Sequence, residues 1–210
     1  MITSEQIYKI IALIVEANKV ALKYYQSNEY KVLIKEDSSP VTDADNIISE
    51  MLSLGLQKII PGVPVISEEN KIEVNVKIIE ENKCFWLVDP IDGTQGFISK
   101  DGNFTINAGL ISDNKPIFGI ISEPLLDEIY FTENGKAYCI KKGNLEAISV
   151  NKVDNGLRIL TSRRHSSKRT AAVISTLPVT EVMTVSSSYK FCMIAAGRSD
   201  CYLHFGPTCT

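Results

Sequence analysis

The chain has 210 residues, of which 44% are hydrophobic and 22% charged, and its formal net charge is −3. This composition is typical of a globular protein with one large domain or two small ones. The acidic balance argues against a broad basic surface for nucleic acid polymers. The five cysteines are odd in number and form no Cys-x-x-Cys pair, so reduced thiols in a cytosol fit better than a disulfide framework or a zinc site.

The N-terminal part has a helical pattern. Isoleucines at helical spacing, with Thr3 and Gln6 resembling a capping box, predict an amphipathic helix over about residues 4–26. Its apolar run, residues 10–15, is short and lacks a small-residue cleavage pattern, which argues against a signal peptide. No segment approaches the ~20 apolar residues that a membrane-spanning helix requires. The sequence therefore predicts a protein without a membrane span.

A polar loop through residues 35–40 comes next, and a second amphipathic helix is predicted to begin at Thr42 or Asp43. Pro61 and the Gly-Val-Pro that follows it end this helix. Residues 63–67 are then predicted to form a short strand.

After residue 100 the pattern becomes rich in strands, and it then alternates between strands and helices, as in an α/β layer. The first group of predicted strands is 104–111, 117–122, 128–131 and 137–140. The alternating part is predicted as strand 157–160, helix 167–177, strand 182–185, helix 189–197 and strand 201–205. Polar residues and glycines gather over 142–156, which predicts a boundary between an N-terminal α+β domain, 1–145, and a C-terminal α/β domain, 146–210.

The most informative segment is Asp89-Pro90-Ile91-Asp92-Gly93-Thr94, directly after the apolar run 84–88. Two carboxylates stand three residues apart at the end of a predicted buried strand, and hard divalent cations prefer such oxygen ligands. Pro90 stiffens the backbone between them, and Gly93 frees it just beyond. A helix beginning there would offer backbone N–H groups to an anion. The segment predicts a metal-assisted reaction on a phosphate.

Two other acidic pairs could converge on this segment: Asp43 and Asp45 at a predicted helix start, and Glu68 and Glu69 after a predicted strand. Each pair lies at the end of an element, where side chains project into clefts. Without a Cys or His nearby, the ligand set is all oxygen, which favours Mg²⁺ or a related ion over zinc.

Each acidic motif also has a simpler explanation. The helix macrodipole alone favours acidic residues in a first turn. The paired glutamates could lie on a solvated loop, and Asp, Pro and Gly are all turn formers. The occurrence of all three motifs in order, the last one after a fully apolar strand, favours a shared metal site.

These motifs carry a resemblance to a known family. The hexapeptide, followed by Phe97, resembles the first signature of the inositol monophosphatase superfamily. Ser-Pro-Val-Thr-Asp-Ala-Asp at 39–45 and Ile-Ser-Glu-Glu at 66–69 resemble its companion motifs in the same order. Four later segments resemble the CysQ-type branch, the 3'(2'),5'-bisphosphate nucleotidases: 104–107, 162–165, 187–192 and 205–208.

The resemblance implies a layered αβαβα sugar-phosphatase-like fold of the α+β or α/β class, with an incomplete C-terminal layer. It implies an Mg²⁺-dependent, lithium-sensitive phosphomonoesterase. This enzyme would remove the 3'-phosphate of adenosine 3',5'-bisphosphate to give AMP and phosphate. The enzyme would be cytoplasmic, or peripheral at the inner membrane, and would recycle a by-product of sulfate activation. The oligomeric state is not implied.

The resemblance also implies a metal site. Glu68, Asp89 and the backbone carbonyl of Ile91 would bind the first Mg²⁺, and Asp89 would bridge to a second ion held also by Asp92. A third ion is compatible with the pattern. Two metals roughly 3.5–4 Å apart can activate a water and stabilise the leaving oxygen.

The catalytic residues implied are Glu68 and Thr94, which would orient the attacking water, and Asp45, which would support water activation or a further metal. The substrate-binding positions implied are Ile91, Asp92, Gly93, Thr94, His165, Ser188 and Lys190.

Two histidines have alternative explanations. His165 fits the nucleotide side of the site, or a solvated loop beside Arg163 and Arg164. His204 stands where many relatives carry an arginine. It would be a weaker, pH-dependent phosphate contact, or a histidine at the edge of the core, which we favour slightly.

In relatives a second signature, Trp-Asp, follows the Gly-Pro-Thr segment, and its aspartate binds the second metal and the substrate. This sequence stops at Thr210, on an open turn after a predicted strand. The resemblance therefore implies weak binding of the second metal and strongly reduced phosphatase activity of the chain by itself. A trimmed form, a frameshifted gene and a functional minimal form remain open. So do two other functions: an inositol or sugar phosphate monoesterase, and an inactive metal- or nucleotide-binding remnant.

Overall fold

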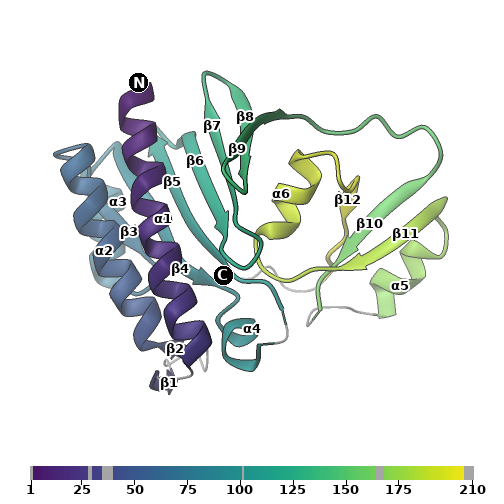
Figure 1. The fold of residues 1–210 in the computed structure, drawn as a ribbon, viewed down its shortest axis with the longest axis horizontal. Helices are drawn as coiled ribbons and strands as arrows, with labels where there is room; N and C mark the ends of the chain where they lie inside the picture. The colour runs from purple at the N-terminus through teal and green to yellow at the C-terminus, as the bar shows by residue number, and fades with distance from the viewer. Residues whose placement is uncertain (1, 28–29, 35–39, 101, 164–167, 206–210) are drawn as a thin grey trace.

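The computed structural model describes residues 2–27, 30–34, 40–100, 102–163 and 168–205. Two β-sheets, with helices on them and between them, make up most of it (Figure 1). The helices are α1 (Ser4–Ser27), α2 (Asp43–Ile59), α3 (Ile72–Glu81), α4 (Thr94–Ser99), α5 (Lys168–Ile174) and α6 (Tyr189–Ala195). The strands are β1 (Val32–Ile34), β2 (Pro40–Thr42), β3 (Val65–Ser67), β4 (Cys84–Asp92), β5 (Thr105–Ser112), β6 (Lys115–Glu123), β7 (Glu128–Glu133), β8 (Lys136–Lys141), β9 (Asn144–Ile148), β10 (Leu157–Thr161), β11 (Val179–Thr184) and β12 (Cys201–Tyr202).

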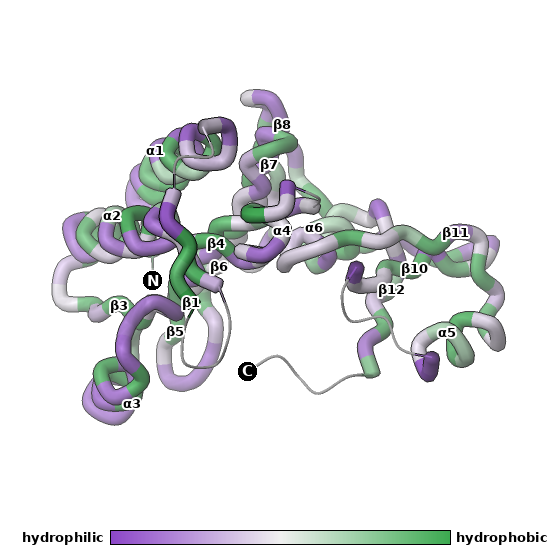
Figure 2. Tube along the Cα trace, turned by 90° about the horizontal axis from the view of Figure 1, so that it is seen from below, coloured by the Kyte–Doolittle hydropathy of each residue, from purple (hydrophilic) through white to green (hydrophobic). Residues whose placement is uncertain are grey.

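The first sheet has seven strands in the order β3-β4-β5-β6-β7-β8-β9. β3 and β4 are parallel, and every other neighbouring pair is antiparallel. α1 and α2 pack against each other on one face of this sheet, and α3 lies at its β3 edge (Figure 2). The predicted helix over 4–26 is confirmed. Its isoleucine stripe is buried, with Ile10 and Ile14 fully inaccessible, because it faces the sheet.

The second sheet is parallel and has the order β11-β10-β12. α6 contacts both β6 of the first sheet and β12 of the second, so it lies between the two sheets. Figure 1 shows α5 at the outer side of the second sheet. The order of layers is helices, sheet, helix, sheet, helix. This arrangement confirms the expected mixed α/β fold class.

Some elements were not predicted. The segment that forms α3 is rich in β-branched residues, which disfavour helices. Tertiary contacts fix it instead: Asn75 donates its side-chain N–H to the carbonyl of Ser67, 2.9 Å away at the end of β3. β1 and β2 form a small antiparallel pair, which was not predicted.

β9 was also missed, because its residues are mostly exposed and lack an apolar face. It completes the first sheet by pairing with β8. The predicted domain boundary between residues 145 and 146 falls within this strand, and the division into two domains stays a prediction. In the part of the chain that the structure describes, no helix is long and apolar enough to cross a membrane.

Candidate active site

The acidic motifs meet at the end of β3 and β4. These strands are parallel, with Ser67 opposite Val88, so the residue after β3 lies beside the end of β4. The backbone N–H of Glu68 donates to the carbonyl of Val88 at 3.1 Å, which brings Glu68 next to Asp89. These two carboxylates are 21 positions apart in the sequence, and the parallel pairing of β3 with β4 brings them together.

Asp89 lies at the centre of the cluster. A side-chain hydrogen bond joins it to Glu68. Burial raises the pKa of Asp89 to about 9, and the negative charges of Asp92 and Glu68 add to this shift. Its Oδ1 atom is buried without a hydrogen-bond partner. The carboxyl therefore holds a proton at neutral pH unless a cation takes the proton's place.

Asp45 belongs to the same cluster, whereas Asp43 points away from it. Asp45 is buried at the start of α2, and its Oδ2 accepts hydrogen bonds from the backbone N–H and hydroxyl of Thr42. Burial raises the pKa of Asp45 despite these bonds. The carboxylate of Asp43 instead accepts the N–H of Lys31, 3.1 Å away beside β1. Of the predicted pair, only Asp45 reaches the site.

Thr94 connects Asp45 to the end of β4. Its hydroxyl lies 3.0 Å from the carbonyl oxygen of Ile91 and 3.3 Å from Oδ1 of Asp45, and it can donate to either. Gly93, between β4 and α4, has φ = 93°, and a Cβ there would lie 3.1 Å from the carbonyl oxygen of Asn103. A residue with a side chain would be strained in this turn and crowded against that carbonyl.

Asp92 accepts hydrogen bonds from the start of α6 and from β5. The backbone N–H of Ser188, just before α6, donates to Oδ2 of Asp92, and the hydroxyl of Thr105 lies 3.4 Å from the same atom. Burial raises the pKa of Asp92, although the Ser188 bond and the positive charge of Lys190 oppose the shift. Ser188 and Lys190 therefore lie beside Asp92. Their role in binding the substrate stays a prediction.

Lys190 is mostly buried, with 7% of its surface exposed. Its ammonium donates to the carbonyl of Ser187 and lies 5.2 Å from the ring centroid of Tyr202. Its positive charge acts on the carboxylate of Asp92.

Neither Thr105 nor Asn107 was predicted to have a role, although both lie in the segment 104–107, which carries part of the resemblance. The antiparallel pairing of β4 with β5 places Asn107 opposite Asp89 and Thr105 opposite Asp92. Ser188 donates its hydroxyl to Oδ1 of Asn107 at 2.7 Å. Identifying them requires the register of β4 with β5, which cannot be counted along the chain because α4 lies between the two strands.

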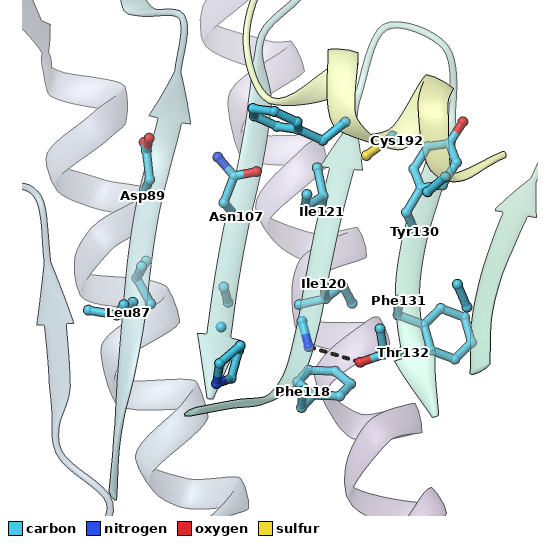
Figure 3. Close-up of a pocket in the computed structure, with 18 of the residues that line it drawn as sticks. Leu87, Asp89, Asn107, Phe118, Ile120, Ile121, Tyr130, Phe131, Thr132 and Cys192 are labelled. Atoms are coloured by element: carbon cyan, nitrogen blue, oxygen red, sulfur yellow. Dashed lines mark hydrogen bonds between the residues drawn. The ribbon is translucent and has the colours of Figure 1, made fainter. Parts of the chain in front are cut away.

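A groove of about 660 Å³ begins at these carboxylates and runs along the first sheet beneath α6. Figure 3 shows Asp89 and Asn107 side by side at one end, and Phe118, Ile120 and Phe131 at the other. Its lining is polar at the carboxylate end and mainly apolar elsewhere.

His165 lies outside the described residues, as do Ser39 and the Gly-Pro-Thr segment at 206–208. His204 is described: it is half-buried after β12, and its ring stacks on Tyr202 with centroids 6.0 Å apart. This packing places His204 beside the ring that contacts Lys190. A role of His204 in phosphate binding stays a prediction.

The carboxylates fit a hard divalent cation in their chemistry. Only oxygen donors meet here, one buried carboxylate oxygen is unpaired, and mutual repulsion helps to raise the pKa of Asp89. Within the described ranges, no three His, Cys, Asp or Glu side chains already form a complete metal-binding set. Binding of a cation here would displace the proton that the raised pKa of Asp89 retains.

The layered fold and the carboxylate cluster define a class of protein. The model of the inositol monophosphatase family matches residues 3–210, and the chain belongs to this family. A curated relative is the 3'(2'),5'-bisphosphate nucleotidase CysQ of Salmonella typhimurium. It is 36% identical over 174 residues, which are 83% of this chain and 70% of the relative.

Solved structures agree. CysQ from Bacteroides thetaiotaomicron superposes with a TM-score of 0.72 at 28% identity, over 95% of this chain and 80% of that one. An IMPase/NADP phosphatase complexed with Mg²⁺ and phosphate has a TM-score of 0.78 at 18% identity, over 97% of this chain and 76% of that one. The second comparison supports the fold alone.

Proposed function

We propose that this chain is an Mg²⁺-dependent bisphosphate nucleotidase, which hydrolyses the 3'-phosphate of adenosine 3',5'-bisphosphate to AMP and phosphate. The main support for the proposal is the side-chain hydrogen bond between Glu68 and Asp89, whose carboxyl also lies near those of Asp45 and Asp92. Similarity to the CysQ nucleotidases supports the choice of substrate. A cytoplasmic or peripheral inner-membrane location, and a role in recycling the by-product of sulfate activation, belong to the same proposal.

Glu68, Asp89, Asp92 and the carbonyl of Ile91 would hold two or three Mg²⁺ ions, and inhibition by Li⁺ is expected. Mg²⁺ bound there would neutralise charge on the phosphoryl oxygens and lower the pKa of a water molecule. The carbonyl of Ile91 also faces Thr94, and its two lone pairs allow both contacts.

Thr94 and Asp45 would act on the attacking water. The hydroxyl proton of Thr94 is directed to Ile91 or Asp45, so its oxygen is left to accept a hydrogen bond from water. A proton leaving the water would pass to Thr94 while the proton of Thr94 passes to Asp45. The raised pKa of Asp45 suits it to receive that proton.

Residues from α6 would hold the rest of the substrate. Lys190 supplies a positive charge beside Asp92, and Ser188 lies next to it at the start of the helix. We assign the 5'-phosphate to Lys190, with Ser188 and the predicted His165 on the same side. Gly93 and Thr94 would contact the transferred phosphate through their backbone N–H groups.

The test is phosphate release from adenosine 3',5'-bisphosphate and from inositol 1-phosphate, each with and without Mg²⁺. The proposal predicts Mg²⁺-dependent release with a preference for the nucleotide. Preference for inositol 1-phosphate would instead indicate a monophosphatase, and tight nucleotide binding without release would indicate an inactive binding protein. Adding the Salmonella CysQ as a comparator also tests the sequence-based expectation of reduced turnover.

A further inference from the structure

A second buried charged cluster lies outside the carboxylate site and joins the first sheet to α6. Its centre is Glu128, the first residue of β7, whose side chain is 2% exposed. Glu128 accepts hydrogen bonds from side chains on four different segments: Tyr130, Lys141, Tyr189 and Arg198. Tyr130 and Lys141 belong to the first sheet, whereas Tyr189 lies on α6 and Arg198 follows that helix.

The contacts with the α6 side are direct. The Tyr189 hydroxyl lies 2.9 Å from Oε2 of Glu128, and the two terminal nitrogens of Arg198 lie 3.0 and 3.2 Å from its two carboxylate oxygens. The Arg198 guanidinium also lies over the rings of Tyr189 and Tyr130, at 5.4 and 5.6 Å. Donors from both sides of the contact fix the position of this carboxylate between the first sheet and α6, and two cations compensate its charge.

Glu128 is ionised when these contacts form. Burial raises the pKa of its carboxyl, but hydrogen bonds from Lys141 and Tyr189, together with the positive charge of Arg198, outweigh burial and leave the pKa below its ordinary value. The bonds that hold α6 are therefore charge-assisted, which makes them shorter and stronger than neutral ones.

α6 connects the Glu128 cluster to the carboxylate site. Tyr189 is flanked in sequence by Ser188, whose N–H donates to Asp92, and by Lys190, whose charge acts on Asp92. The hydroxyl of Ser188 also donates to Asn107 on β5. A shift of α6 at Tyr189 would move both neighbours relative to Asp92.

We infer that Glu128 is a positioning residue for this site: through Tyr189 and Arg198 it fixes α6 on the first sheet, so that Ser188 meets Asp92 and Lys190 meets the substrate's second phosphate. The part that concerns the phosphate rests on the proposed function. The part that concerns Asp92 does not depend on the substrate.

The test compares two partners of the same carboxylate. Tyr189→Phe removes the hydroxyl that donates to Glu128 from α6 and accepts from Arg198. Lys141→Met removes a partner within the first sheet and leaves the α6 contacts in place. Two quantities are measured on the full 210-residue chain: Mg²⁺ affinity by calorimetry, and the ratio of kcat/KM for adenosine 3',5'-bisphosphate over adenosine 3'-monophosphate.

Tyr189→Phe is expected to weaken Mg²⁺ binding and to lower the substrate ratio, each by about tenfold, as the loss of an outer supporting bond typically does. Lys141→Met is expected to leave both quantities near wild type even if it lowers Tm. Equal effects of the two variants, or unchanged values in Tyr189→Phe, would overturn the inference. If wild type hydrolyses neither nucleotide, the proposed function fails, while the Mg²⁺ affinities still decide the role of Glu128.

Discussion

Replacing Asp89 with asparagine is predicted to stabilise the Mg²⁺-free protein, which is the opposite of what most buried substitutions do. The pKa of this carboxyl rises from 3.8 to about 9 on folding. At pH 7 the folded state therefore keeps a proton that the unfolded state has lost, and folding must recover it. This difference destabilises the native state on the order of 4 kcal/mol, from 1.36 kcal/mol for each pH unit above 3.8. Asparagine is neutral in both states and removes the penalty.

Because the pKa of Asp89 is raised in the folded state, the stability of the folded protein depends on pH. A carboxyl whose pKa is raised in the folded state destabilises that state progressively as pH rises from 3.8 to about 9. In Mg²⁺-free buffer, wild type should lose stability over this range, and Asp89→Asn should lose much less. For a chain of this length, each 1 kcal/mol corresponds to about 2–4 °C in Tm. The variant should therefore melt several degrees higher than wild type at pH 7.

The assay is thermal unfolding followed by circular dichroism, with and without Mg²⁺. Mg²⁺ should raise the Tm of wild type and leave that of Asp89→Asn unchanged, because the variant lacks the ligand that gives up its proton. Asp127→Asn is the matched control, since Asp127 is exposed in the turn between β6 and β7. A lower Tm for Asp89→Asn without Mg²⁺, or an undiminished response to Mg²⁺, would refute the reasoning.

Three further substitutions test other parts of the site. Lys190→Ala should lower kcat/KM on adenosine 3',5'-bisphosphate by about tenfold more than on adenosine 3'-monophosphate, because only the first carries the 5'-phosphate and both share any effect through Asp92; equal losses on both would remove Lys190 from that role. Thr105→Val should weaken Mg²⁺ binding by about tenfold in calorimetry, since it deletes a hydroxyl beside Asp92; unchanged affinity would count against it. Gly93→Ala should lower the free energy of unfolding in urea by about 1–3 kcal/mol, and by more than Gly135→Ala, whose φ is also positive but whose Cβ would meet open space.

Much of the fold could be predicted because its signals are local. The isoleucine spacing of α1 and the apolar run of β4 are readable in short windows, and each element buries the face that its pattern indicates. α3 could not be predicted, because its residues have low helix propensity and contacts with β3 fix it. The small, exposed β9 depends on its neighbour β8 in the same way.

The candidate site was likewise predictable only where its signals are local. The hexapeptide placed Asp89 and Asp92 at a strand end, and the structure has them there. The acidic pattern alone offered both Asp43 and Asp45, and only the family resemblance selected Asp45. The direction of each side chain depends on contacts with Thr42, Thr94 and Lys31.

Long-range contacts explain the other omissions. Thr105 and Asn107 required the register of β4 with β5. Glu128 required the placement of α6 against a sheet about sixty residues earlier in the chain, as its bond to Tyr189, 61 positions away, illustrates. No short window of sequence contains either kind of information.

Following adenosine 3',5'-bisphosphate with ³¹P NMR in the presence of the protein is a direct test of the proposed hydrolysis. The 3'-phosphate resonance is expected to decline while AMP and inorganic phosphate appear, only when Mg²⁺ is present and not with Asp89→Asn. Loss of the 5'-phosphate resonance instead, or a spectrum that Mg²⁺ leaves unchanged, would contradict it.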